Sequence, residues 1–148
     1  MTLLDGVYET HIEVADLDRA MEFYGDTLDL ELGRYEEERG IAFYFTGSPR
    51  SMLGVWEKDD PEQGHFAFRV AEEEVGEMLP FLEERDIEPR AAFGVEPNEP
   101  IVHPWMPSAT AYFSDPDGNS LELLADLSDD PDPEGKPMPL SEWRERQD

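Results

Sequence analysis

The side chains of this sequence that could hold a metal ion lie at matching positions in its two halves. When the halves are aligned at the Val-Ala pair that ends each first strand, Glu9 falls opposite His65. When they are aligned at the Phe before each last hairpin turn, Gly54 falls opposite Glu122. His11 lies two residues beyond Glu9, on the same strand face and about 7 Å along, so it could supplement or replace Glu9.

Two carboxylates with one or two imidazoles form a plausible first shell for a divalent ion. This donor set suits Mn²⁺, Fe²⁺, Ni²⁺ or Zn²⁺, with open positions for substrate oxygens, although the site could also work without a metal. Because imidazole titrates near neutral pH, His11 or His103 could serve as a general base in a catalytic site.

Three further side chains are candidates for a substrate pocket. Trp56 and Trp105 offer aromatic faces, and Trp105 lies in the proline-stiffened segment 100–107, which is either a pocket wall or a loop that packs over its own indole. Arg69 lies two residues beyond His65, where it could pair with an anionic substrate or with Glu9.

The elements that must position these residues repeat in one order, strand–helix–three strands. The first half predicts strands at 7–14, 30–36, 40–46 and 51–57 with a helix over 16–28, begun by Asp16 as N-cap. The second half predicts strands at 65–70, 87–93, 108–114 and 119–125 with a helix over 72–85. We therefore expect an α+β protein built from two βαβββ modules, at about 6–58 and 63–125, that form one domain over 1–126.

The remaining segment, 127–148, is an acidic, proline-rich C-terminal arm. Its prolines break regular structure, and the stretch around Trp143 could form a short helix. An exposed indole in a free tail would be unfavourable, so we expect the arm to dock on the chain or on another subunit.

Three stretches resemble one known family. The segments Val14–Tyr24, His65–Val70 and Tyr112–Glu122, the last containing Asp-Pro-Asp-Gly-Asn, are similar to motifs of the vicinal-oxygen-chelate superfamily, which includes glyoxalases, bleomycin-resistance proteins and extradiol dioxygenases. The resemblance implies a curved, partly open barrel of mixed β-sheet with flanking helices, and it implies His65 and Glu122 as metal ligands. The family's first-strand histidine position falls on Glu9, whereas the histidine present is His11.

The charge balance narrows the possible partners. The chain has 37 acidic and 11 basic residues, a net charge of −26, so nucleic acids and anionic membrane surfaces are unfavourable partners. It has no cysteine, its N-terminal residues do not follow a signal-peptide pattern, and no apolar run has the length of a membrane span, so we expect a cytoplasmic protein. The acidic surface suggests a halophilic source.

Two functions from different classes fit these features. One is a metal-dependent lyase, isomerase or dioxygenase acting on a small oxygenated molecule. The alternative is a metal-free protein of the bleomycin-resistance type that binds an aromatic or cationic molecule; a structural dimer with a vestigial pocket is a blander possibility. Basic residues that would hold a glutathione conjugate are scarce, and the resemblance implies a homodimer.

The net charge predicts salt-dependent stability. Repulsion among exposed carboxylates acts over about 10 Å at 0.1 M salt and about 3 Å at 1 M. The free energy of unfolding should therefore rise steeply along a KCl series, as measured by urea denaturation at each salt concentration. Full stability at low salt would contradict the halophilic origin.

Overall fold

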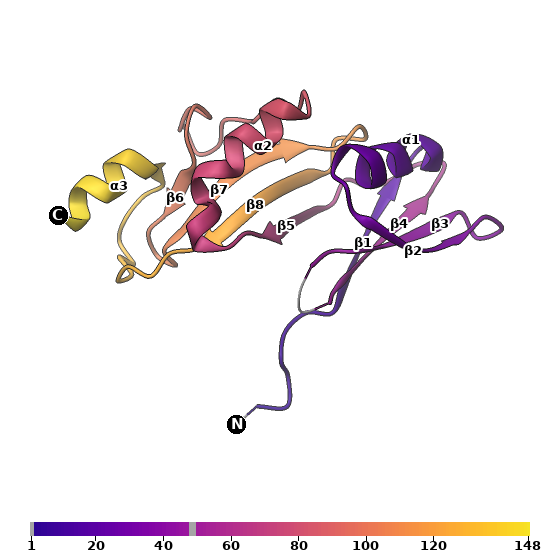
Figure 1. Ribbon diagram of the computed structural model, residues 1–148, viewed down its shortest axis with the longest axis horizontal. Helices are drawn as coiled ribbons and strands as arrows, with labels where there is room; N and C mark the ends of the chain where they lie inside the picture. The colour runs from indigo at the N-terminus through magenta and orange to yellow at the C-terminus, as the bar shows by residue number, and fades with distance from the viewer. Residues whose placement is uncertain (1, 48–49) are drawn as a thin grey trace. The chain divides into compact units, whose positions relative to one another are not determined.

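The computed structural model describes residues 2–47 and 50–148, which divide into two compact units. The first unit runs up to Phe66 and also contains the loop Asp115–Asn119. The second contains Ala67–Ser114 and Ser120–Asp148. Each unit has a β-sheet with helices beside it (Figure 1).

The first sheet has four strands in the order β1-β4-β3-β2. Their bounds are β1 Glu9–Val14, β2 Glu31–Glu36, β3 Ile41–Phe45 and β4 Met52–Glu57. β1 runs parallel to β4 and the other pairs are antiparallel, so the sheet is mixed. The parallel register places His11 opposite Gly54. Ile12 and Val14 are buried, and Glu9 and His11 lie on the other face of the strand, as the alternation predicts.

The helix of the first unit begins at the predicted cap. The Asp16 side chain accepts a hydrogen bond from the Arg19 backbone N–H at 3.1 Å, which satisfies one of the free donors of the first turn. The α-helix α1, Leu17–Met21, continues as a π-helix, η1, Glu22–Thr27. The helical stretch therefore covers the predicted range, with Leu17, Ala20 and Tyr24 buried.

The loop Asp115–Asn119 holds the junction between β1 and α1. Asp117 Oδ1 accepts the Ala15 backbone N–H at 2.8 Å and the Arg19 guanidinium at 2.9 Å. The buried Asn119 amide donates to the Glu13 carbonyl at 3.1 Å. Asp115 is buried within the loop, and its carboxylate accepts the Tyr24 hydroxyl at 2.7 Å.

The second sheet has five strands in the order β5-β8-β7-β6-β9. Their bounds are β5 His65–Arg69, β6 Ile101–His103, β7 Ser108–Ser114, β8 Ser120–Asp126 and β9 Met138–Pro139. A 3₁₀ helix, η2 Glu72–Glu77, leads into α2 Met78–Glu84, which lies along the sheet (Figure 1). Phe113 of β7 and its partner Leu121 of β8 are buried, as are Met78 and Leu82 of α2.

The strand predicted at 87–93 is wrong. Pro89 cannot donate to a ladder, and the segment makes only two isolated bridges, from Arg90 to Tyr112 and from Ala92 to Val95. Phe93 and Gly94 both have positive φ, 54° and 74°, and form a tight turn between Ala92 and Val95. The module's middle strand is instead β6, inside the segment expected as a pocket wall, so the βαβββ order holds with one strand displaced along the sequence.

The C-terminal arm packs on the second unit. β9 pairs with β6, and α3 Leu140–Gln147 follows it (Figure 1). Trp143 is buried, and its indole donates to Asp129 at 2.9 Å. The indole is therefore covered by the chain's own residues.

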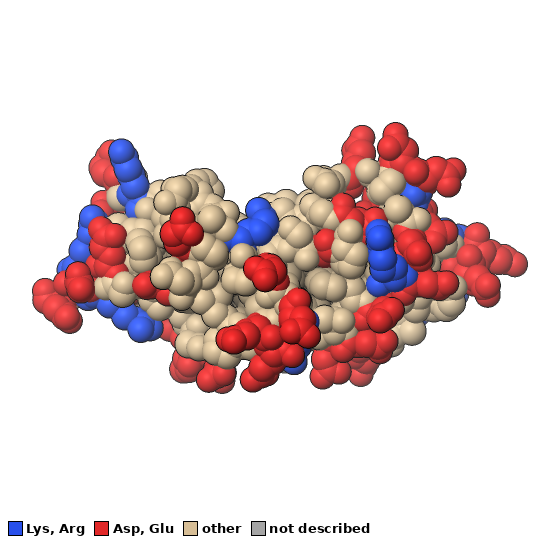
Figure 2. All heavy atoms as spheres, turned by 90° about the horizontal axis from the view of Figure 1, so that it is seen from above, with Lys and Arg blue, Asp and Glu red and all other residues tan. Residues whose placement is uncertain are grey.

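The predicted α+β class and the two βαβββ modules are confirmed, with two mixed sheets of four and five strands that do not form a closed barrel. Acidic side chains are spread across the visible surface, with few basic ones among them (Figure 2). None of the helices in the described ranges has the length and apolar composition of a membrane span.

The bond from Tyr24 to Asp115 predicts a measurable stability difference between two tyrosines. Burial, and then the Asp115 charge, raises the pKa of the Tyr24 hydroxyl far above its ordinary value, so it stays a donor. A hydrogen bond to a charged group contributes about 1.5–3 kcal/mol, so Tyr24→Phe should lower the free energy of urea unfolding by about that amount. Tyr44→Phe is the matched control, because its hydroxyl makes only a 3.4 Å bond to the Met21 carbonyl. Equal losses for the two variants would contradict the role given to Asp115.

Candidate functional site

In the first unit, three predicted residues lie in one connected group. Trp56 Nε1 donates to His11 Nδ1 at 2.7 Å, and His11 Nε2 lies 3.5 Å from Glu9 Oε2. The group forms on the face of β1 and β4 opposite the buried Ile12 and Val14. It is partly open to solvent, since the His11 and Glu9 side chains retain 39% and 46% of their exposure.

Gly54 makes room for this group. A Cβ added at Gly54 would collide with the Nδ1 and Cε1 atoms of His11. The His11 ring also meets Phe43 edge-on, with 6.1 Å between ring centroids. The position that overlay of the halves left without a ligand is therefore filled by the imidazole from the neighbouring strand.

In the second unit, a chain of polar side chains surrounds Glu122. Glu122 is buried, although carboxylates are rarely buried without partners. Thr110 Oγ1 donates to Glu122 Oε1 at 2.8 Å, and the Tyr112 hydroxyl also hydrogen bonds to this carboxylate. His103 Nε2 lies 2.8 Å from the Tyr112 hydroxyl oxygen. The sheet places Tyr112 directly opposite Glu122, so the chain runs across three adjacent strands.

The surroundings of this chain fix the protonation of its members. Burial raises the pKa of Tyr112 to about 12, with a further contribution from the Glu122 charge, so the hydroxyl stays protonated at neutral pH. Burial lowers the pKa of His103 below its ordinary value, against a smaller opposite effect of Glu122. Neutral His103 can then donate Nε2–H to the Tyr112 oxygen, while Tyr112 donates to Glu122. His103 Nδ1 is left as a basic atom.

An aromatic side chain in a strained conformation covers His103. Phe93 has a φ of 54°, a region that costs non-glycine residues about 1–2 kcal/mol. Its ring packs edge-on against His103, 5.1 Å between centroids, and lies 6.3 Å from Tyr112. The Arg90 guanidinium also lies over the Tyr112 ring, with its carbon 5.7 Å from the ring centre.

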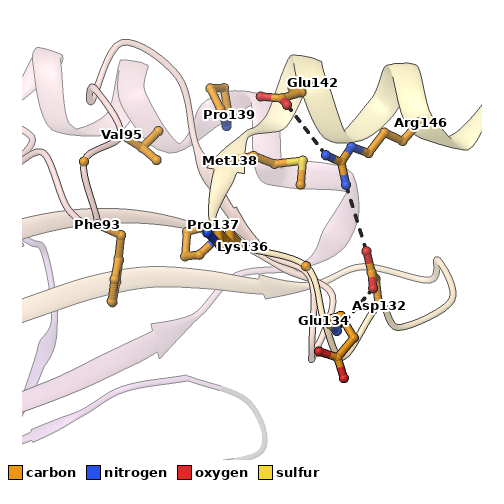
Figure 3. Close-up of a pocket in the computed structure, with 12 residues that line it drawn as sticks. Phe93, Val95, Asp132, Glu134, Lys136, Pro137, Met138, Pro139, Glu142 and Arg146 are labelled. Atoms are coloured by element: carbon orange, nitrogen blue, oxygen red, sulfur yellow. Dashed lines mark hydrogen bonds and ion pairs between the residues drawn. The ribbon is translucent and has the colours of Figure 1, made fainter.

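Beside Phe93 the second unit has an open cavity of about 530 Å³ (Figure 3). Phe93 and Val95 border it from the tight turn, and Met138 borders it from the C-terminal arm. Arg146 reaches across it between Asp132, at 3.9 Å, and Glu142, at 3.8 Å. The Arg146 guanidinium is thus paired with a carboxylate on each side, and its side chain forms part of the cavity wall.

The remaining predicted site residues, His65, Arg69 and Trp105, are exposed. His65 begins β5 and is exposed. Arg69 lies 3.6 Å from Asp126 in an exposed ion pair. Trp105 is exposed in the turn after β6. Within the described ranges, no three His, Asp or Glu side chains are gathered closely enough to form a metal site.

Sequence reasoning missed Thr110 and Tyr112 as site residues. The two residues on β7 had a signal, because alternate residues of a strand share a face and Tyr112 pairs with a predicted ligand in the adjacent strand. The place of Phe93 beside His103 depends on the left-handed turn that replaced the predicted strand.

The fold agrees with one family over most of the chain. The model of the Glyoxalase/Bleomycin resistance protein/Dioxygenase superfamily matches residues 9–123. The chain belongs to this superfamily. No curated protein matches it.

Solved structures of similar fold agree with this assignment. An integron cassette protein from the mobile metagenome of a Halifax Harbour sewage outfall is 27% identical, with a TM-score of 0.72 over 82% of this chain and 99% of that one. A lactoylglutathione lyase from Agrobacterium tumefaciens is 26% identical, with a TM-score of 0.64 over 84% and 96%. The oxidase ChaP-H2, 21% identical with a TM-score of 0.64 over 86% and 98%, shares the fold.

Burial and the Glu122 charge act in opposite directions on the pKa of His103, and together they predict how it titrates. In an NMR titration, His103 should protonate below the ordinary imidazole pKa of about 6.5. Glu122→Gln should lower that pKa further, because it removes the charge that favours the imidazolium. The stability that depends on neutral His103 is complete above the ordinary pKa and is lost as the pH falls below it. An upward shift in Glu122→Gln would contradict the arrangement.

Proposed function

We propose that this protein is a divalent-metal-dependent enzyme that acts on a small oxygenated molecule, with Glu122 as its buried metal ligand. The observation that carries the proposal is the support around this carboxylate. Glu122 is held by Thr110 and Tyr112, and ligating carboxylates are characteristically hydrogen bonded in this way. A buried carboxylate held in this way is better suited to bind a metal ion than an exposed, solvated carboxylate.

The proposed ligands are side chains whose donor atoms bind divalent ions. They are His65 from β5, Glu122 from β8 and, from β1, Glu9 or His11, whose carboxylate and imidazole donors suit a divalent ion. When bound, such an ion polarises a carbonyl or stabilises an enediolate as a Lewis acid.

The residues of the second unit would then handle the proton. His103 is neutral at pH 7 because burial lowers its pKa, and its Nε2–H is directed to Tyr112. Nδ1 can therefore accept a proton from a bound molecule, and Tyr112 and Glu122 would steady the imidazolium that results. Phe93 packs edge-on against this imidazole.

A lyase, isomerase or dioxygenase reaction fits this arrangement, and Trp56, Arg69 and Trp105 stay predicted pocket residues. A homodimer in a salt-rich cytoplasm also belongs to the proposal. It rests on the family resemblance and on the net charge of −26.

One feature favours the metal-free alternative. The first unit has an open hollow of about 510 Å³ bordered by Asp18, Glu22 and Asp26 and by the rings of Tyr35 and Tyr44. Carboxylates beside aromatic rings attract cationic molecules, as a resistance-type binding protein requires. Such a protein would bind its ligand without metal.

Elemental analysis of protein purified in high KCl without chelator tests the proposal. The wild type should carry close to one equivalent of Mn, Fe, Ni or Zn, and the double variant His65→Ala, Glu122→Gln should lose it. Glu134→Gln, an exposed carboxylate, is the control and should keep the metal. Metal-loaded protein is then screened with diketones, hydroxy-ketones and catechols.

A wild type that takes up no metal even after reconstitution would exclude the metal-dependent enzyme. Thermal-shift screening with cationic aromatic molecules would then test the binding-protein alternative. A shift that is lost in Asp18→Asn, Glu22→Gln would support the hollow of the first unit as the site.

A further inference from the structure

The open cavity beside Phe93 is bounded by a segment that lies outside the family match. Its volume of about 530 Å³ is in the range of small-molecule sites. The tight turn between Ala92 and Val95 borders it on one side, and the C-terminal arm, from Asp132 to Arg146, borders it on the other (Figure 3). The match to the superfamily ends at residue 123, before the arm begins. The cavity therefore depends on a part of the chain that the family model does not include.

The tight turn presents an aromatic ring to the cavity at an energetic cost. Ala92 and Val95 exchange backbone hydrogen bonds at 3.2 and 2.9 Å, and the two residues between them, Phe93 and Gly94, both have positive φ. Such turns favour Asn or Gly at the first of these positions, because a larger side chain is strained there. The Phe93 side chain nevertheless keeps 68% of its exposure. A molecule bound against this ring would bury apolar surface that now lies in water.

The wall on the side of the arm is apolar and held in place. Met138 is buried, and β9, which carries it, pairs with β6. Pro137 and Pro139 flank it and have no N–H that needs a hydrogen-bond partner. Ser141, near the start of α3, donates to the Glu99 carboxylate through its backbone N–H at 2.6 Å and its hydroxyl at 3.0 Å. This wall is therefore formed before any ligand binds, which lowers the entropy cost of binding.

The charged side chains around the cavity favour a cation. Among the described residues, three carboxylates and two cations border it, namely Asp132, Glu134, Glu142, Lys136 and Arg146. Arg146 pairs with Asp132 at 3.9 Å and with Glu142 at 3.8 Å, so its charge is offset within the wall (Figure 3). Glu134 and Lys136 are both exposed. The surplus of negative charge, in a chain of net charge −26, attracts a cation and repels an anion.

We propose that this cavity binds a small organic cation of the quaternary ammonium type, held between the ring of Phe93 and the carboxylates of the arm. Aromatic faces attract such cations, and neighbouring carboxylates offset their charge. The methyl groups of the ion would contact the apolar wall at Met138. The site needs no metal, and its residues differ from those of the acidic hollow in the first unit.

Three probes of one shape test the class of ligand. Choline, 3,3-dimethylbutanol and 3,3-dimethylbutanoate carry a positive charge, no charge and a negative charge. Each is titrated into methyl-¹³C-methionine protein at constant high KCl and followed by NMR. The Met138 signal, assigned with Met138→Leu, reports on this cavity, and the Met21 signal reports on the hollow of the first unit. Choline should shift the Met138 signal saturably and bind at least about threefold more tightly than the alcohol, with the carboxylate weakest.

The same titrations can overturn the proposal. Choline that shifts neither signal, or the Met21 signal alone, would exclude this cavity as the site. Tighter binding of the alcohol or of the carboxylate at Met138 would make the cavity an apolar or an anion site and would also refute the proposal. None of these results depends on metal content, so the metal-dependent function is decided separately.

Single substitutions test the contacts. Phe93→Leu keeps an apolar side chain without the aromatic face, so it should weaken choline binding about three- to tenfold. Phe93→Asn, which suits the turn, should weaken binding as much and serves if Phe93→Leu fails to fold. Because salt screens their charges, Glu134→Gln should weaken binding only about twofold, and Lys136→Gln should strengthen it about twofold.

Glu83→Gln is the matched control, since it removes an exposed carboxylate of α2 that does not border the cavity, and it should leave choline binding unchanged. Unchanged binding in both Phe93 variants, or weaker binding in Lys136→Gln, would refute the site.

Discussion

Four hydrogen-bond donors converge on the carboxylate of Asp115, and the first unit depends on that convergence. The donors are the Tyr24 hydroxyl, the backbone N–H groups of Asp117 and Asn119, and the Asn119 amide. A buried carboxylate without such partners would cost several kcal/mol, so the loop can adopt little else. Its other contacts fix Glu13 and Ala15 at the end of β1. The strand that carries Glu9 and His11 is therefore held in place by a loop about 100 residues further along the chain.

The need for hydrogen-bond partners distinguishes two buried carboxylates from the many exposed ones. Among the described residues, Asp115 and Glu122 are the buried carboxylates, in a chain with 37 acidic residues. Exposed carboxylates are solvated, and salt screens their repulsion. The hydrogen bonds of Asp115 stabilise a loop. Glu122 lies beside Tyr112 and His103, whose pKa values are shifted in opposite directions, and such perturbed groups cluster at functional sites.

Alternation and capping predicted most of the fold because they act over a few residues. Asp16 caps its helix, and β7 falls on the predicted range 108–114 because each residue type there suits a strand with a buried face. The segment 87–93 reaches β7 only through the bridge from Arg90 to Tyr112, whereas β6 pairs with Ser108–Thr110 of the same strand. A strand needs a neighbour as well as a pattern, and the choice of neighbour is a property of the whole sheet.

The sequence by itself determined the module order, the acidic surface and the chemical types at Glu9, His11, His65 and Glu122, since these follow from residue identity and short-range spacing. Only the tertiary structure decided what those types can do. Trp56 is 45 residues from His11, yet its indole donates to the imidazole, because the parallel pairing of β1 with β4 places Gly54 under the ring. His103 gains its lowered pKa from burial beside Tyr112, across two strands. Hydrogen-bond direction and desolvation depend on neighbours in space, which the order of residues along the chain does not specify.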